Sequence, residues 1–294
     1  TNNKSRCKKS AFLFIFIPLI LTIVNAIQLK QRVDFYNNLT HNARFEFSEY
    51  NIAFNNAIQQ FIDDKMGDEQ QRLPENFQWI QSVRDDLYTL IKTNSPTLVD
   101  GSTVTTRYYS VKPTTFTFPT DYYDFILLQP VISGITSYSR PTDYNQLGPL
   151  LESSFEHPTN QKTYYNENAT GMTIWRGTAG TISSATFTYL KQPATFSIGT
   201  ESNLINAGGT LTNALVYYAT EISVYGGVTY AIGASITGTG AALTSGQVIL
   251  STNTVTTDLP ERVQDDLCKK CSVIMLKNIS MYDDAAAVES QISK

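Results

Sequence analysis

The sequence predicts an α+β protein: a helical bundle built from N- and C-terminal helices, with a β-rich, sandwich- or barrel-like insertion. Two observations lead to this prediction. Apolar residues recur at helical spacing near both ends of the chain, and the middle holds Thr-, Val- and Tyr-rich runs separated by glycine breaks. Only 16% of the residues are charged, whereas Tyr and Phe number 17 and 15. This balance favours strands over long solvated helices.

The predicted helices come first and last in the chain. Apolar residues of "EYNIAFNNAIQQFIDD" fall on one helical face, with Ser48 as the expected N-cap and Gly67 as the stop. A second stripe in "NFQWIQSVRDDLYTLIK" predicts a second helix that Pro96 ends. The last helix is expected in "DLPERVQDDLCKKCSVIMLKNI", where Asp258 and Glu261 have the spacing of a capping box.

The predicted strands fill most of the middle of the chain. They are "STVTTRYYSVK", "MTIWR", "TISSATFTYLK", "ALVYYATEISVY", "GVTYAIGASI" and "GQVILSTN", with a tight hairpin at Gly226-Gly227. "FPTDYYDFILLQPVISG" is expected to form a short helix, and the polar stretch 139–170 a long surface loop. The predicted regions are therefore a hydrophobic extension (1–32), a helical bundle (33–98 plus 257–294), a β-rich core (99–199) and a small β module (200–256).

The N-terminal extension has the pattern of a secretory signal peptide. Basic residues precede an apolar run from 11 to 27, which ends in Val24-Asn25-Ala26. The run is at the lower limit for a helix that spans a bilayer. Four interpretations of the run remain open: a signal peptide cleaved after Ala26, a membrane anchor, an upstream extension, and an arm buried against a neighbouring subunit. The extension and the arm are preferred, because the rest of the chain has no sign of an oxidising compartment.

Residues that carry chemistry are scarce. The chain has two histidines and three cysteines, and no nucleophile, phosphate-binding or dinucleotide motif. Cys268 and Cys271 lie at i, i+3 on one helix, which favours two core thiols over a metal or redox site, since a structural zinc site needs four ligands. Pairs of aspartates, such as Asp85-Asp86, are interpreted as solvated surface. No catalytic, cofactor-binding or metal-binding residue is predicted, and the chain is not expected to be an enzyme.

Several motifs together, in their order, resemble a known family. They are the two helical stretches quoted above, "FTFPTDYYDFILLQPV", "LESSFEHPTNQKTYY", "TFTYLKQPATFSI" and the C-terminal helix, over roughly residues 33 to 281. The pattern resembles the head-to-tail connector or adaptor (tail ring) proteins of podovirus-type phages, especially crAss-like phages. Residues 200–256, with "EISVYGGVTYAIGASITG", are similar to small β domains of phage virion proteins and depart from the simplest adaptor pattern.

The resemblance implies a structural role in the virion. Copies would form a homo-oligomeric ring, twelvefold, between the portal protein and other tail proteins. Phage DNA would pass through the lumen without specific binding, which a net charge of −4 suits. The hypothesis places subunit interfaces on the Tyr-rich strands and the C-terminal helix, at Tyr217, Tyr218, Tyr225, Val263, Leu267 and Ile274.

Two other hypotheses remain. An exported cell-surface or periplasmic β-rich binding protein would use the N-terminal run as its signal peptide. An enzyme that uses the Cys268–Cys271 pair is the third. Cleavage after Ala26 would distinguish the exported protein, and bound metal would distinguish the enzyme.

Overall fold

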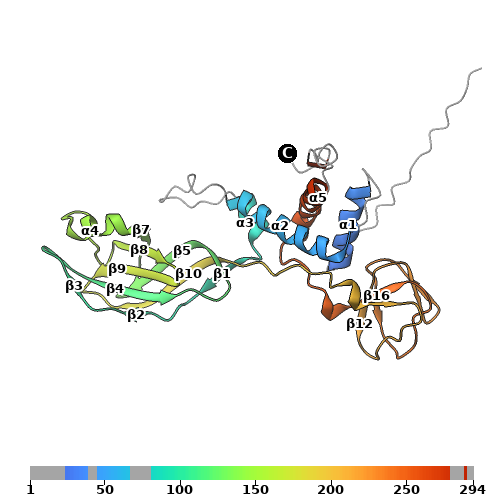
Figure 1. Cartoon of the computed structure of the whole chain (residues 1–294). Coiled ribbons are helices and arrows are strands. Elements are labelled where there is room, and N and C mark those ends of the chain that lie inside the picture. Colours follow the sequence, from blue (N-terminus) through green and yellow to red (C-terminus); the bar gives the residue numbers. More distant parts are fainter. Residues whose placement is uncertain (1–23, 39–44, 67–80, 279–287, 290–294) are drawn as a thin grey trace, which may run out of the picture.

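The computed structural model describes residues 24–38, 45–66, 81–278 and 288–289, and shows an α+β fold. Figure 1 shows three regions along an elongated molecule: a β-sandwich, a helical layer in the centre and a small β module at the opposite end. The helical layer contains α1 (Ala26–Asn38), α2 (Phe47–Met66), α3 (Gln81–Leu87) and α5 (Glu261–Asn278).

The sandwich consists of two sheets. The first has the order β1-β10-β5-β6, and the second β2-β4-β9-β8-β7 with β3 beside β4. Residues from both sheets form its core, including Phe116, Leu128, Met172 and Phe187. The bounds are β1 (Ile91–Asn94), β2 (Val99–Asp100), β3 (Val104–Thr105), β4 (Ser110–Thr117), β5 (Tyr122–Ile132), β6 (Ile135–Thr136), β7 (Ser139–Pro141), α4 (Tyr144–Glu152), β8 (Thr163–Asn168), β9 (Gly171–Gly177) and β10 (Ile182–Lys191).

Three sequence predictions are wrong in the sandwich. The predicted helix over "FPTDYYDFILLQPVISG" is strand β5, which pairs with β10 along most of its length. The predicted loop 139–170 contains β7, α4 and β8. Two polar side chains of β8, Thr163 and Asn166, are buried because they find partners: Trp175 Nε1 donates to Asn166 Oδ1 at 2.6 Å, and the Ser139 and Thr163 hydroxyls lie 2.7 Å apart. "STVTTRYYSVK" forms a β3–β4 hairpin rather than one strand.

The second predicted helix is shorter than expected. Helix α3 ends at Leu87, and residues 91–94 form β1, so the helical region does not extend to residue 98. Strand β1 pairs with β10, with Ile91 opposite Leu190 and Asn94 opposite Phe187. The sheet supplies hydrogen-bond partners that outweigh the helical spacing of the local sequence. The predicted stop at Gly67 lies outside the described residues.

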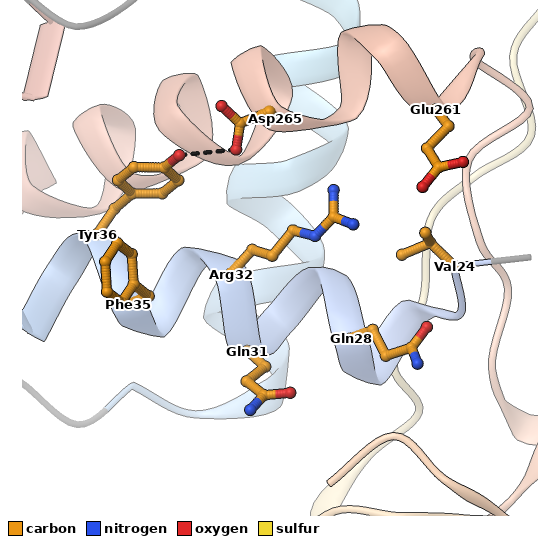
Figure 2. A pocket seen from close by; sticks show the side chains of 8 residues that line it. All are labelled: Val24, Gln28, Gln31, Arg32, Phe35, Tyr36, Glu261 and Asp265. Carbon is orange, nitrogen blue, oxygen red and sulfur yellow. Dashed lines mark hydrogen bonds between the residues drawn. The ribbon is translucent and has the colours of Figure 1, made fainter. Parts of the chain in front are cut away.

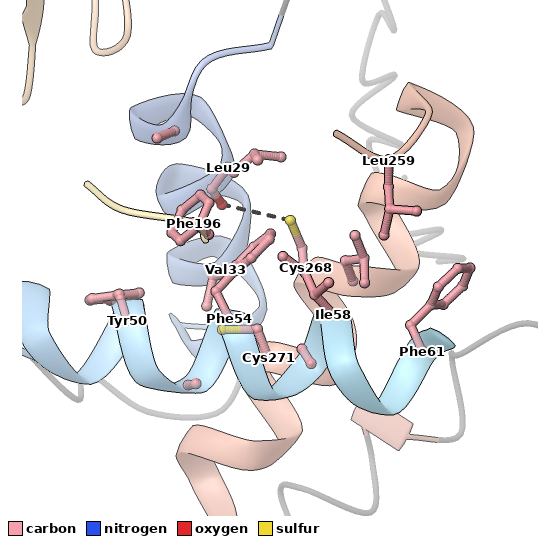
Figure 3. Packing of buried hydrophobic residues seen from close by; sticks show 14 of the residues in the cluster. Leu29, Val33, Tyr50, Phe54, Ile58, Phe61, Phe196, Leu259, Cys268 and Cys271 are labelled. Carbon is pink, nitrogen blue, oxygen red and sulfur yellow. Dashed lines mark hydrogen bonds between the residues drawn. The ribbon is translucent and has the colours of Figure 1, made fainter. Parts of the chain in front are cut away.

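The helical layer is held together by one apolar core. Figure 3 shows α1, α2 and α5 packed face to face, with side chains of all three converging. The sandwich-to-module connection contributes Phe196, whose ring stacks on Phe54 with 4.1 Å between centroids. The apolar face predicted for α2 is confirmed, because its buried residues are Tyr50, Ala53, Phe54, Ala57, Ile58, Phe61 and Ile62.

The helix starts differ from those predicted. Helix α5 begins at Glu261, and Asp258 does not cap it. The Asp258 carboxylate instead accepts hydrogen bonds from Lys191 Nζ at 2.6 Å and the Ala194 backbone N–H at 3.3 Å. Ser48 lies inside α2, which starts at Phe47. A true reciprocal cap forms at α1, where Asn25 and Gln28 exchange side chain-to-backbone hydrogen bonds of 3.0 Å.

The end of the predicted signal peptide belongs to this layer. Val24, Ala26 and Ile27 are buried in its core, and the Asn25 amide donates to the Gly233 carbonyl of the small module at 2.8 Å. Residues 1–23, with most of the apolar run, lie outside the described residues. Among the described helices, none has both the length and the apolarity needed to cross a bilayer.

The small module has its own core, formed among others by Leu211, Tyr217, Ile236 and Val248. Its four-stranded sheet has the order β11-β16-β12-β15, beside the hairpin β13-β14. The hairpin predicted at Gly226-Gly227 is confirmed: both glycines have positive φ, 56° and 77°, as a tight two-residue turn requires. The bounds are β11 (Leu204–Asn206), β12 (Val216–Ala219), β13 (Ser223–Tyr225), β14 (Val228–Tyr230), β15 (Ser235–Thr237) and β16 (Gln247–Leu250).

The chain enters the module through a linker, residues 192–200, that is fixed to α2. Asn55 exchanges two hydrogen bonds with the Phe196 backbone, at 2.8 and 2.9 Å. Asn51 accepts from the Ile198 N–H at 2.8 Å and donates to the Gly199 carbonyl at 3.1 Å. The two asparagine side chains therefore bond to N–H and C=O groups of the linker backbone, as a neighbouring strand would. These bonds fix the position at which the module begins.

Candidate assembly surfaces

Most of the residues predicted to form subunit interfaces are buried in the chain itself. Tyr217 and Tyr225 belong to the module core, and Val263 and Leu267 to the helical core. Tyr217 Oη also accepts the Thr212 N–H at 2.9 Å. In this fold the four side chains stabilise the monomer and are not available to a partner. Apolar spacing predicts that one face of an element is buried, but it does not show whether the same chain or a partner covers that face. The prediction therefore mistook core positions for interface positions.

The other two predicted interface residues, Tyr218 and Ile274, are half-buried. Both pack at the edge of the helical core. Tyr218 lies on β12, between β15 and β16, so it joins the module to the helices. Their role between subunits stays a prediction.

The two cysteines of the CxxC pair lie on the buried face of α5. The Cys268 thiol points at the Leu29 carbonyl at 3.7 Å (Figure 3). The Cys271 sulfur lies 3.8 Å from that of Met275. Burial raises the pKa of Cys268 to about 12, and it raises that of Cys271 well above its ordinary value. Among the described residues, no group of three or more His, Cys, Asp or Glu side chains is arranged to hold a metal ion.

The aspartate pairs link helices rather than only facing water. Asp86 of α3 accepts Lys65 of α2 at 2.9 Å and Arg262 of α5 at 2.9 Å. Lys270 of α5 reaches Asp64 of α2 at 2.6 Å. The interpretation of these pairs as solvated surface is therefore incomplete, because members of the pairs form ion pairs with side chains of neighbouring helices.

A first hollow lies between α1 and the start of α5. It has a volume of about 540 Å³ and is lined by Val24, Gln28, Gln31, Arg32, Phe35, Tyr36, Glu261 and Asp265. Figure 2 shows Arg32 extending between Asp265 and Glu261, and Tyr36 donating a 2.7 Å hydrogen bond to Asp265. Burial, and then this hydrogen bond, raise the pKa of Tyr36 far above its usual range. The charged lining makes this hollow a poor fit for an apolar group.

A second hollow, here called the α2 groove, lies between α2 and the linker. Its volume is about 560 Å³, and no charged side chain lines it. Ile52 stands at its edge with 62% of its surface exposed. The other lining side chains include Asn56, Gln59, Pro193, Ala194 and Thr195. The groove is thus an uncharged depression in which amide and hydroxyl side chains outnumber apolar ones, seven to five.

Exposed aromatic and aliphatic side chains lie at the end of the sandwich away from the linker, here called the distal end. Strands β5 and β9 end there, and β4, β8 and β10 begin there. Strand β6 presents Ile135 at this end, and separate turns present Tyr108, Tyr138 and Phe155; each of the four is more than half exposed. Large exposed apolar side chains brought together from several loops are typical of a protein–protein contact.

The turn that carries Phe155 is tightly built. Ser153 Oγ accepts the Glu156 N–H at 3.0 Å, and the His157 ring stacks on Tyr109 with 3.6 Å between centroids. Glu156 pairs with Lys162 and accepts the Tyr164 hydroxyl at 2.9 Å, and these contacts lower the pKa of its carboxyl. Phe155 nevertheless remains 87% exposed. Sequence reasoning missed it, because it lies in the stretch predicted as a loop.

These features define an α+β protein whose distinctive surfaces are suited to contact with other macromolecules. The family model of the SU10 adaptor protein matches residues 54–231, more than half of the chain. The chain therefore belongs to the SU10 adaptor protein family, and is a phage structural adaptor. The match covers α2 from residue 54 onward, the sandwich and the first part of the small module, so residues 200–231 are not foreign to the family. No curated protein matches the chain.

Proposed function

We propose that the protein forms an oligomeric ring at the portal–tail vertex and connects head to tail around the DNA channel. Membership of the adaptor family carries the proposal. The proposal includes a twelvefold ring, contacts with the portal protein and with other tail proteins, and a role without catalysis. The narrower assignment to crAss-like, podovirus-type phages rests on the order of the sequence motifs alone.

The net charge of the chain supports a role next to DNA without DNA binding. The net charge of −4 provides no general attraction to a polyanion, so DNA would slide past rather than adhere. We infer that the helices act as a bundle that packs subunit to subunit, with the sandwich and the module facing neighbouring components. The elongated arrangement in Figure 1, with different surfaces at its two ends, suits a subunit with several neighbours.

Purified virions test the proposal directly. Mass spectrometry should find the chain among the virion proteins, and electron cryomicroscopy of the portal vertex should show it as one ring of the stack. Absence of the chain from intact virions would refute the proposal. The exported-protein alternative is not favoured by the family membership; it predicts a mature chain that begins after Ala26, which N-terminal sequencing of the native protein would detect.

A further inference from the structure

We propose that the stretch at the start of α1, residues 24–28, is a strap that locks the small module onto the helical layer, and that the chain is not cleaved after Ala26. The strap is the stretch in which the predicted signal peptide ends. The inference goes beyond the proposed ring and does not depend on it.

Three contacts join the strap to the small module and to the chain that leaves it. The Asn25 side-chain amide donates to the Gly233 carbonyl at 2.8 Å, and the Thr256 hydroxyl donates to the Val24 carbonyl at 3.2 Å. Gln28 packs so closely on Gly233 that a Cβ atom at this glycine would lie 2.4 Å from Gln28 Cγ. The linker fixes the module to α2 where the chain enters it, and these contacts supply a second attachment, on α1.

The strap is ordered because its polar groups bond to one another. Gln28 Oε1 accepts the Asn25 N–H, and Asn25 Oδ1 accepts the Gln28 N–H, both at 3.0 Å. This reciprocal cap uses the Asn25 oxygen and leaves its amide nitrogen for the module carbonyl. One side chain therefore both starts α1 and holds the module, so the position of the module is coupled to the start of the helix.

Cleavage after Ala26 would destroy the strap. Val24 and Ala26 are 7% and 1% exposed, and both belong to the core of the helical layer. The cut would remove them together with the Asn25 cap, and would place the new α-ammonium on Ile27, which is 1% exposed. A buried charge without a partner is strongly unfavourable, and a positive charge at the start of a helix opposes the helix dipole. The fold therefore requires Val24 and Asn25 to stay attached to α1.

A matched pair of glycine substitutions tests the strap. Gly233 and Gly240 have nearly the same positive φ, 78° and 80°, so alanine strains both backbones alike. The added Cβ meets α1 at Gly233, whereas at Gly240 no atom of the described residues lies within 4 Å of it. Spin labels on Ile52→Cys of α2 and Ile222→Cys of the module, in a Cys7→Ser background, report the distance between the two regions. The two cysteines of α5 are buried and stay unlabelled.

Double electron–electron resonance reads the distance distribution in the full chain. Gly233→Ala should broaden the distribution and add longer distances, and Asn25→Ala, which removes the cap and the bond to the module, should do the same. Gly240→Ala and Gln31→Ala, a change at an exposed position of α1, should leave the distribution as narrow as in the parent. Circular dichroism checks that all four variants fold. If Gly233→Ala or Asn25→Ala gives the same distribution as its control, the strap does not hold the module and the inference is overturned.

Processing is measured separately. The full chain is expressed in a bacterial host with an active secretion pathway, and the purified product is analysed by intact mass and N-terminal sequencing. A chain that begins no later than Val24 is expected, whereas a chain that begins at Ile27 would overturn the inference. Presence or absence of the chain in virions changes neither result, so failure of the proposed function and failure of the strap are distinguishable.

Discussion

Replacing the buried Arg176 should lower the free energy of unfolding of the sandwich more than replacing an exposed arginine of the same sandwich. Arg176 lies on β9 near the distal end and is 1% exposed. Its guanidinium donates to Asp100 at 3.1 and 3.3 Å, to the Gly177 carbonyl at 3.1 Å and to the Gly180 carbonyl. It therefore links edge strand β2 to the turn between β9 and β10. The test variant is Arg176→Met, which keeps the apolar stem and removes every donor.

The expected cost follows from the acceptors left behind. The carbonyls of Gly177 and Gly180 lose their guanidinium donor, at about 1–3 kcal/mol for each unsatisfied buried group. Asp100 keeps Lys112 at 2.7 Å and Thr114 at 2.6 Å, so it adds little. Removing a buried charge also relieves its desolvation, which offsets part of the loss. We expect a fall of about 2–3 kcal/mol in the free energy of unfolding.

Tryptophan fluorescence can follow the sandwich alone. The chain has two tryptophans, and Trp79→Phe leaves Trp175, the neighbour of Arg176, as the reporter. Urea unfolding is then compared among the parent, Arg176→Met and a control, Arg140→Met, which removes an exposed arginine from the same sandwich and should cost less than about 0.5 kcal/mol. If Arg176→Met costs no more than this control, the buried network does not stabilise the sandwich and the reasoning is wrong.

Acid should weaken the same network. Hydrogen bonds, first from Lys112, and the nearby Arg176 charge lower the pKa of Asp100 from 3.8 to about 2. A carboxyl with a lowered pKa stabilises the fold above its unfolded-state pKa and loses this effect as the pH falls through the folded-state value. The Asp100 side chain is 39% exposed, so after solvent screening its ionised form contributes about 1 kcal/mol to the free energy of unfolding. The stability difference between the parent and Asp100→Asn should shrink between about pH 4 and 2. A constant difference over this range would contradict the assignment.

Three further predictions concern the helical layer. Asp86→Asn removes the acceptor shared by α2 and α5, so the free energy of unfolding should fall by about 1 kcal/mol and hydrogen exchange in α3 should become faster. Glu221→Gln is the exposed control. Equal exchange in α3 of both variants would contradict the linking role of Asp86. Asn55→Ala breaks both bonds to the linker and should cost about 1–3 kcal/mol in thermal or urea unfolding, while the exposed neighbour Asn56→Ala should cost almost nothing. Cys268, with a pKa raised to about 12, should resist alkylation at pH 8 until urea unfolds the chain; rapid labelling of the native protein would show that the core is open there.

Helices whose apolar stripe faces a single core could be predicted from the sequence. The stripe of α2 and the apolar side of α5 matched the buried faces, and the two glycines of the β13–β14 turn marked a hairpin. In each case one local signal, spacing or turn chemistry, coincides with the tertiary environment.

Elements whose environment comes from distant residues could not be predicted. Strand β5 is partly covered on both faces, so it shows a continuous apolar run, which periodicity cannot distinguish from a helix. Strand β8 is polar and yet has buried positions, because Trp175 and Ser139 satisfy its side chains. Ile91 continues the apolar stripe of the predicted helix, but residues 91–94 pair with β10 as a strand.

The candidate contact surfaces show the same limit more strongly. Tyrosines on strands were expected at interfaces, but Tyr217 and Tyr225 fill a core, whereas Phe155 stands in water. Exposure depends on which face of an element is covered, and a single sequence does not contain this information for irregular turns. The α2 groove likewise depends on distant residues, because Asn51, Asn55 and Phe54 of α2 hold the linker against the helix.

The attachment of the small module has a consequence for how the protein can vary. Ser197 and Val255 pair as an antiparallel bridge, with hydrogen bonds of 2.9 and 2.7 Å, so the chain leaves the helical layer and returns to it at adjacent points. An insertion whose two ends are neighbours can grow, shrink or be exchanged between lineages without rerouting the rest of the chain. Recombination could thus replace the module while the sandwich and the helices keep their places.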